Sequence, residues 1–249
     1  MTVKIYTHDE AMKASVEYFD GDELAASVFL GKYALRDGEN NLLEKTPEDM
    51  HWRIANELAR VEAKKFKTPL SAQQIFNYLD RFKKLVMQGS PMYGIGNPYQ
   101  YVSVGNCFVL PSPVDSYLGI LHTDNQIVQI SCRRGGVGWD NSKLRPKDAR
   151  VRNAAKSTTG MVSFAKRFSN TIREVCQNGR RAASLQSVSC WHPDISEFIA
   201  VKQDLTQMTG SNISIQFDDQ FMQSVVNDTE VNLRWPVTAE DAKQMGRSF

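Results

Sequence analysis

From residue 101 onward, strand-like and helix-like segments alternate, and this alternation constrains the fold more than any other feature of the sequence. Short apolar runs predict strands, and apolar residues at helical spacing predict the helices between them. The predicted strands cover residues 101–110, a short segment after 135–138, 182–189, 212–217 and 231–235, and the predicted helices cover 116–132, 160–176, 192–202 and 218–226. Alternation of this kind is typical of an α/β architecture.

Residues 1 to about 90 have a different pattern, in which apolar residues recur at helical spacing. Two helices are expected within residues 9–35. A third helix begins after Thr46, which can cap it, and Pro47 suits its first position. A fourth begins at Ser71 with a capping box and can end at Gly89. These residues are expected to serve packing.

The composition is that of a protein that can bury a core, with 41% hydrophobic and 23% charged residues among 249. We expect an all-helical domain over residues 1–89 and an α/β domain over residues 90–249. A net charge of +2 argues against binding to nucleic acid through bulk charge. No apolar run reaches the roughly 20 residues that span a bilayer, and the N-terminus lacks a signal-peptide pattern, so a cytoplasmic protein without a membrane partner is expected.

The cysteines and histidines show no metal-ligand spacing, so no metal-binding residue is predicted. None of the four cysteines, at positions 107, 132, 176 and 190, forms a CxxC pair. In a reducing compartment they are expected to be buried or reactive thiols and not structural disulfides. Cys107 stands in or beside an apolar strand, where it can be a small core residue or a reactive thiol.

A glycine-rich turn and two basic clusters are the remaining candidate features. The turn at 135–138 lacks the full dinucleotide-binding spacing, but its glycines can let a ligand approach the backbone closely. Arg180 and Arg181 follow Gly179 on a loop, where they can remain solvated or reach a phosphate or base. The other cluster is either a solvated face or a site for a small polyanion such as a nucleotide, and it contains Lys143, Arg145, Lys147, Arg150 and Arg152.

Seven short motifs, each weak alone, follow one another in a specific order. They are Ser90-Pro91, Asn106-Cys107-Phe108-Val109-Leu110-Pro111, Asp115-Ser116, Gly135-Gly136-Val137-Gly138, Lys143-Leu144-Arg145-Pro146, Gly179-Arg180-Arg181 and His192-Pro193-Asp194-Ile195. In order and spacing they resemble the catalytic subunit of ribonucleotide reductase along most of residues 50–235. The resemblance implies an α/β fold class, with a helical N-terminal domain followed by the first half of a ten-stranded α/β barrel.

The resemblance also implies roles for individual residues. Cys107 would be the reducing cysteine on a barrel strand, which supplies electrons and a proton as the ribose 2′-hydroxyl is removed and then forms a disulfide with a second cysteine. The substrate nucleotide would be held by Ser90, Asn106, Gly136 and either Arg180 or Arg181, which lie on a flexible loop near residues 177–185. The deoxynucleoside triphosphate that sets specificity would be bound by Asp115, Ser116, Lys143, Arg145 and Arg152.

The cofactors and partners implied are those of the same family. A dNTP or ATP effector would bind with Mg²⁺, and the radical would come from a metal-containing small subunit or from adenosylcobalamin. The expected partners are the C-terminal half of the catalytic subunit, a second copy of the chain, a radical-generating small subunit, and thioredoxin or glutaredoxin acting through a C-terminal tail.

The sequence departs from the family pattern in ways that leave alternatives open. It contains no Asn-Pro-Cys-x-Glu segment for the radical cysteine, no second half-barrel, no C-terminal cysteine tail and no N-terminal ATP-cone motif. We therefore expect part of a catalytic subunit, as one piece of a split enzyme, a truncated gene product or an expressed fragment. The alternatives are a nucleotide-binding regulatory module that performs no chemistry and an unrelated α/β protein.

Overall fold

The computed structural model describes residues 4–177 and 180–247, with only the backbone described for residues 176–177 and 180–181. The chain divides into two compact units: the first comprises the residues up to Asn106 and a short later piece that includes Arg180, and the second comprises the rest of the chain from Cys107 onward. Each unit is described by itself below, and each contains its own cluster of buried apolar side chains. The expected domain boundary between residues 89 and 90 stays a prediction.

The first unit is helical, as the spacing of its apolar residues predicts. Thr46 and Asp49 form a capping box at the start of its longest helix, in which Pro47 takes the first position. Met50 and Ile54 on this helix are fully buried in the core of the unit. The elements are α1 (His8–Tyr18), α2 (Glu23–Lys32), α3 (Pro47–Lys65), α4 (Ala72–Leu79), the 3₁₀ turn η1 (Asp80–Phe82) and α5 (Gly89–Gly94).

The prediction that the fourth helix runs to Gly89 is wrong. Helix α4 begins after Ser71 as predicted but ends at Leu79, because Arg81 and Phe82 adopt positive φ angles of 51° and 55°. The Arg81 guanidinium donates a hydrogen bond to the Tyr18 carbonyl and lies 4.4 Å from the centre of the Tyr18 ring. This contact between distant segments favours a sharp bend at a place where the local pattern favours a helix.

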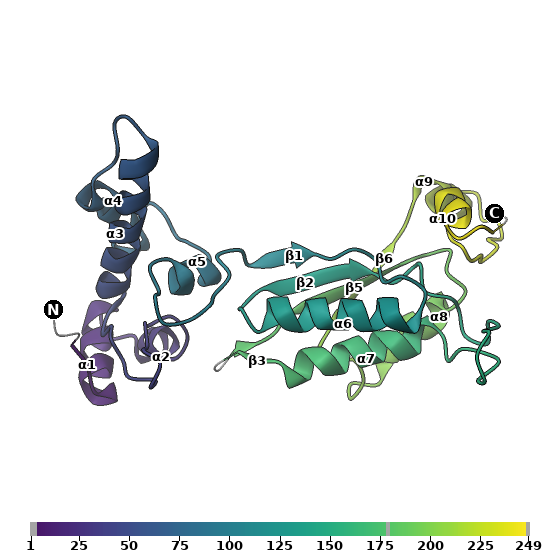
Figure 1. Cartoon of the computed structure of the whole chain (residues 1–249), viewed down its shortest axis with the longest axis horizontal. Helices are drawn as coiled ribbons and strands as arrows, with labels where there is room; N and C mark the ends of the chain where they lie inside the picture. The colour runs from purple at the N-terminus through teal and green to yellow at the C-terminus, as the bar shows by residue number, and fades with distance from the viewer. Residues whose placement is uncertain (1–3, 178–179, 248–249) are drawn as a thin grey trace. The chain divides into compact units, whose positions relative to one another are not determined.

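The second unit is built on a four-stranded parallel sheet in the order β1-β2-β5-β6. Helices α6 and α7 run alongside the sheet, and α6 contacts β2 while α7 contacts β5 (Figure 1). A separate pair of short strands, β3 and β4, lies between α7 and β5 in the sequence. The elements are β1 (Cys107–Val109), α6 (Tyr117–Ser131), β2 (Gly136–Asp140), α7 (Met161–Glu174), β3 (Cys176–Gln177), β4 (Arg180–Arg181), β5 (Ser184–Ser189), α8 (Ile195–Ala200), the 3₁₀ turn η2 (Val201–Gln203), β6 (Asn212–Gln216), α9 (Asp219–Val226) and α10 (Ala239–Gln244).

The order of the strands in the sheet follows their order in the chain without reversal. A doubly wound dinucleotide-binding sheet reverses its strand order at the ligand crevice, whereas the strands of a β/α barrel keep the same order. The observed order is the one that consecutive strands of a β/α barrel have. Its residues in register include Cys107 with Gly136 and Leu185 with Asn212.

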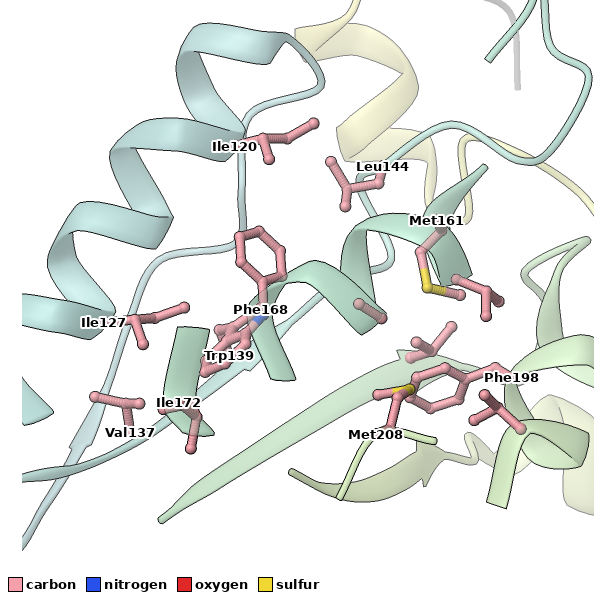
Figure 2. Packing of buried hydrophobic residues seen from close by; sticks show 14 of the residues in the cluster. Ile120, Ile127, Val137, Trp139, Leu144, Met161, Phe168, Ile172, Phe198 and Met208 are labelled. Carbon is pink, nitrogen blue, oxygen red and sulfur yellow. The ribbon is translucent and has the colours of Figure 1, made fainter. Parts of the chain in front are cut away.

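The core of the second unit lies between the sheet and its helices, and the residues labelled in Figure 2 belong to it. Val137 and Trp139 alternate along β2 on this side, as expected for a strand with one buried face. Phe168 of α7 is fully buried and meets the Trp139 ring edge to face, with centroids 5.4 Å apart. This packing fixes α7 against β2.

The opposite face of the sheet, which we call the open face, carries smaller and more polar side chains. Cys107 and Val109 of β1 are exposed, and Gly136 and Gly138 of β2 lie beside them in register. On β5 the buried residues alternate with partly exposed ones, which places Leu185 on the open face.

Two predicted strands differ from the structure. The strand expected over 101–110 is confined to Cys107–Val109, and all three residues are exposed because β1 lies at the edge of the sheet. The segment 231–235 forms no strand; Arg234 donates its backbone N–H to the Trp191 carbonyl and stacks its guanidinium on the Trp191 ring. Pro236 then leads to α10, a short helix that the pattern did not indicate.

None of the helices within residues 4–177 and 180–247 is both long enough and apolar enough to span a bilayer.

Candidate functional site

A cavity of about 650 Å³ lies in the second unit, at the start of α6. A volume of this size suits a small-molecule ligand. Its wall comes from the residues before and within the first turn of α6, from the segment between β2 and α7, from α7 itself and from the segment after α10. The lining residues are Asp115, Ser116, Tyr117, Ile120, Arg145, Arg150, Val151, Arg152, Asn153, Thr158, Phe164 and Arg247.

One side of the cavity is organised by an ion pair. Both oxygens of the Asp115 carboxylate accept hydrogen bonds from Arg145, one from its backbone N–H at 3.1 Å and one from Nε at 2.7 Å. The two side chains are only 15% and 22% exposed, and Arg145 also donates to the Arg150 carbonyl at 2.8 Å. A charge-assisted contact of this geometry holds the two segments together at the cavity wall.

A second group of cations faces the same space. Arg150 and Arg152 are exposed and form no ion pair with any residue that the structure describes. The guanidinium of Arg247 lies 4.6 Å from the centre of the Trp235 ring, which orients it without neutralising it. With Arg145, the lining therefore contains four arginines and one carboxylate. This excess of positive charge favours a ligand with several negative charges.

The start of α6 adds to this preference. Ser116 is its N-cap, and its hydroxyl accepts the Gly119 N–H at 3.0 Å. Only a glycine fits at position 119, because a Cβ there would lie 2.5 Å from the Val114 carbonyl oxygen. The remaining free N–H groups and the helix dipole at this end of a 15-residue helix favour negative charge.

Another part of the wall is apolar and aromatic. Tyr117 and Phe164 lie with ring centroids 6.3 Å apart at an interplanar angle of 70°, and Ile120 and Val151 line the cavity with them. Flat aromatic groups of this kind can stack on a planar ring, while the arginines bind phosphate. The cavity can therefore hold a molecule that has an apolar ring at one end and a polyanion at the other.

The arginines Arg150 and Arg152 are carried by a loop, residues 147–160, that we call the arm. Its two sides pair with each other: the Asp148 N–H donates to the Thr158 carbonyl, the Thr158 N–H to the Ala149 carbonyl, and Arg150 and Ser157 form an antiparallel bridge. The arm is thus a short hairpin-like projection between β2 and α7.

Four of the five residues predicted for the triphosphate effector line this cavity: Asp115, Ser116, Arg145 and Arg152. The fifth, Lys143, is not among the lining residues. Its Nζ lies 3.1 Å from an Asp241 carboxylate oxygen and 3.4 Å from Gln244 Oε1, so it holds α10. Its predicted contact with phosphate stays a prediction, and the structure gives it a different partner.

The residues predicted for the substrate fall into separate places. In the first unit, Ser90 is fully buried and donates its backbone N–H to Asn106 Oδ1 at 3.0 Å, while Asn106 Nδ2 donates to Gln88 Oε1 at 2.6 Å. In the second unit, Gly136 lies opposite Cys107 on the next strand. The backbones of Arg180 and Arg181 form β4, but their side chains, and Gly179 with them, lie outside what the structure describes.

The predicted reducing residue, Cys107, has an accessible thiol at the edge of the open face. The core interpretation of this cysteine is therefore wrong. Of the other described cysteines, Cys132 is exposed, and Cys190 is buried, which raises the pKa of its thiol. Within the residues that the structure describes, no group of three or more histidine, cysteine or acidic side chains could hold a metal ion.

Several lining residues were not singled out from the sequence. Arg150 was visible only as a member of a basic cluster, and Tyr117 and Phe164 only as apolar positions of helices. Arg247 gave no signal, because it is brought to the cavity by tertiary structure across about a hundred residues of chain from Arg152.

A parallel sheet in barrel order, covered by helices and bordered by a basic cavity with an aromatic wall, defines the second unit as an α/β domain suited to a nucleotide-like ligand. Two family models match the chain: the ribonucleotide reductase barrel domain over residues 105–249 and the ribonucleotide reductase all-alpha domain over residues 19–90. The chain belongs to the ribonucleotide reductase large-subunit family.

Individual relatives agree with this assignment. The chain is 28% identical to the vitamin B12-dependent ribonucleoside-diphosphate reductase of Thermoplasma acidophilum, over 89% of this chain and 36% of the relative. It is 25% identical to the ribonucleoside-diphosphate reductase subunit alpha of Helicobacter pylori, over 93% of this chain and 29% of the relative. It is 28% identical to the ribonucleoside-diphosphate reductase large subunit of Caenorhabditis elegans, over 53% and 18%. The chain thus spans about a third or less of the length of these relatives.

Proposed function

We propose that the chain is the N-terminal portion of a ribonucleotide reductase catalytic subunit and that its cavity binds the deoxynucleoside triphosphate that regulates specificity. The observation that carries this proposal is the convergence of Asp115, Ser116, Arg145 and Arg152 on one cavity in the part of the chain that matches the family's barrel domain. The substrate, a ribonucleoside diphosphate or triphosphate, would bind at the open face beside Cys107.

The arrangement suits a triphosphate for physical reasons. Four arginines can balance most of its charge, and Tyr117 and Phe164 can contact its base. The single lining carboxylate, Asp115, is already engaged by Arg145. A Mg²⁺ ion bound with the nucleotide would therefore be held by phosphate oxygens and water and not by a set of protein carboxylates.

In the proposed reaction, Cys107 acts as one of two reducing thiols. The ribose C2′–OH bond is replaced by C2′–H, the hydroxyl leaves as water, and the two electrons come from oxidation of Cys107 and a second thiol to a disulfide. The exposed thiol of Cys107 and the absence of a side chain at Gly136 beside it leave room for a ribose at the open face. A radical source outside this chain, either a small subunit or adenosylcobalamin, would be needed to start the reaction.

The first test is calorimetric titration of the 249-residue chain with dATP and Mg²⁺. We expect saturable 1:1 binding that weakens about tenfold or more in Arg152→Ala, because a guanidinium–phosphate contact is lost. Lys84→Ala, a cation of the first unit, is the matched control and should bind as the wild type does. Equal affinity of the wild type and Arg152→Ala would contradict the proposed site.

The alternative is a regulatory module that binds the nucleotide and performs no chemistry. It is favoured by the fact that the cavity is built entirely from one unit of this chain. The two functions differ in their dependence on Cys107. When the chain is combined with a C-terminal half of the subunit and a radical source, Cys107→Ser should abolish ribonucleotide reduction if the chain is catalytic, and it should leave dATP binding unchanged in either case.

A further inference from the structure

The His192-Pro193-Asp194 segment lies between β5 and α8 and does not line the cavity. In the sequence this segment is one of the seven motifs and lies where a helix is predicted to begin. In the structure both polar residues are buried: His192 is fully buried and Asp194 is 7% exposed. A carboxylate is rarely buried to this extent unless it is bound by several donors, so its partners indicate what it does.

Asp194 binds both ends of the arm. Its Oδ1 and Oδ2 accept the Lys147 N–H at 3.0 and 3.1 Å, and Oδ2 also accepts the Met161 N–H at 3.0 Å. Lys147 is the first residue of the arm, and Met161 is the first residue after it. One buried carboxylate from a segment more than 30 residues away in sequence thus joins the two points where the arm leaves and re-enters the domain.

The backbone at this junction is built for close approach. Gly160, the last residue of the arm, has φ 90° and ψ 171°, a conformation essentially limited to glycine. A Cβ at Gly160 would lie 2.7 Å from both the Cα and the N atom of Lys147. The two ends of the arm are therefore in contact, and Asp194 accepts the N–H groups that this contact leaves without partners in the sheet or in α7.

His192 extends the same junction toward Arg145. Its Nε2 lies 2.9 Å from the Leu144 carbonyl oxygen, and its Nδ1 accepts the Asp194 N–H at 3.0 Å. These partners assign the neutral tautomer with the proton on Nε2. His192 therefore holds the residue before Arg145 and also orients Asp194.

We propose that Asp194 is a positioning residue for nucleotide binding: by joining Lys147 to Met161 it holds the arm in the conformation that presents Arg150 and Arg152 to the cavity. This inference rests on the proposed nucleotide site, but the clamp itself can be measured without a nucleotide. Asp194 does not touch the ligand and acts only through the arm.

The test compares Asp194→Asn with Asp204→Asn in the full chain. An asparagine at 194 keeps one acceptor oxygen and turns the other into a donor that faces backbone N–H groups, so one end of the arm is released. Asp204 is an exposed carboxylate of the same unit that also accepts three hydrogen bonds, from Thr206 N–H, the Thr206 hydroxyl and Gln207, and it lies outside the cavity. It controls for the loss of a well-bonded carboxylate as such.

Two measurements are made on each variant. Amide hydrogen exchange of residues 147–161 reports the clamp, and calorimetric titration with dATP and Mg²⁺ reports its consequence. We expect faster exchange across the arm and about tenfold or more weaker binding in Asp194→Asn, with exchange of β5 and α7 beyond its first turn unchanged. Asp204→Asn should match the wild type in both.

Each other outcome has a definite meaning. Unchanged exchange of the arm in Asp194→Asn would overturn the clamp. Faster exchange of the arm with unchanged dATP affinity would overturn its role in binding. Failure of the wild type to bind dATP would overturn the proposed function and the nucleotide part of this inference together, while the exchange data would still decide whether Asp194 clamps the arm.

Discussion

Ser116 shows how one side chain can serve both the fold and the ligand. Its hydroxyl caps α6 by accepting the Gly119 N–H, and the same residue lines the basic cavity. Because the hydroxyl is occupied by the cap, its contribution to stability can be separated from its contribution to binding by choosing substitutions that keep or remove the cap.

We expect Ser116→Ala to lower the free energy of unfolding by about 1 kcal/mol, because the cap is lost. Ser116→Asp should keep the stability, since aspartate is an equally good cap and favours the helix dipole, but it should weaken dATP binding because a carboxylate then faces the phosphates. Chemical denaturation and calorimetric titration of both variants check this. Tight dATP binding by Ser116→Asp would place the phosphates elsewhere.

His192 makes stability depend on pH. Burial lowers its pKa from the ordinary value of 6.5, and the Leu144 carbonyl, Asp194 and Asp140 oppose this shift without cancelling it. As the pH falls, a group whose pKa is lowered in the folded state is protonated in the unfolded chain before it is protonated in the folded one. The contribution of His192 to the free energy of unfolding is therefore fully present above about pH 6.5 and is lost as the pH falls below that value.

Between about pH 7 and about pH 5, the free energy of unfolding should fall more steeply in the wild type than in His192→Gln, in which the titrating group is absent. His122→Gln, which removes an exposed histidine of α6, is the control and should keep the wild-type slope. Denaturant titrations at several pH values measure these slopes. Parallel slopes in the wild type and His192→Gln would mean that His192 is not the responsible group.

At the scale of elements, the arm between β2 and α7 depends on the glycine at its end. Replacing Gly160 with alanine forces a side chain into a backbone conformation that only glycine tolerates and against the backbone of Lys147. We expect Gly160→Ala to lower the free energy of unfolding by at least about 2 kcal/mol and to weaken dATP binding.

Gly138→Ala is the matched control for this prediction, because the nearest non-adjacent atom to a Cβ at Gly138, the Leu185 carbonyl oxygen, lies at an ordinary 3.6 Å. Thermal unfolding and calorimetric titration compare the two variants. If Gly160→Ala were as stable as Gly138→Ala, the close approach of the arm's two ends would be refuted.

Elements whose signals are local could be predicted from the sequence. Thr46 and Ser71 cap helices where the capping pattern places them, and α7 follows the apolar spacing of residues 160–176. Where the signal was local but a distant contact opposed it, prediction failed. The bend at Arg81 is bound to Tyr18, and the segment expected as a strand near Arg234 is bound to Trp191.

The candidate site was predicted from the order of short motifs and not from the chemistry of single residues. Asp115 and Arg145 are 30 residues apart, and nothing local indicates that they meet. Arg247 could not be found at all, since its place at the cavity depends on how α10 is held. The role of Asp194 was equally hidden, because a carboxylate that binds backbone N–H groups leaves no pattern in the partner segments.

At the scale of the whole molecule, the chain contains two units with separate cores. Ile54 is fully buried in the core of the first unit and Phe168 in that of the second. Since the two clusters share no residue, the units should differ in their response to a cavity created in one of them.

We expect Ile54→Ala to destabilise the first unit by about 2–5 kcal/mol and Phe168→Ala to destabilise the second by about 3–5 kcal/mol. Hydrogen exchange under native conditions, resolved by segment, should speed up within the mutated unit only. Acceleration in both units for either variant would show that they unfold together. The same two proteins thus act as controls for each other.

The arm is attached to the domain at its two ends and at the Arg150 carbonyl, and this has a consequence for how such a site can change. The hydrogen bonds that residues 151–156 form among the described residues stay within the arm, whereas Asp194 and Gly160 secure its two ends. The tip of the arm, residues 151–156, is therefore held separately from the two ends at which the arm joins the domain. We expect changes confined to residues 151–156 to alter ligand binding at the proposed nucleotide site and to leave the sheet that carries Cys107 unchanged.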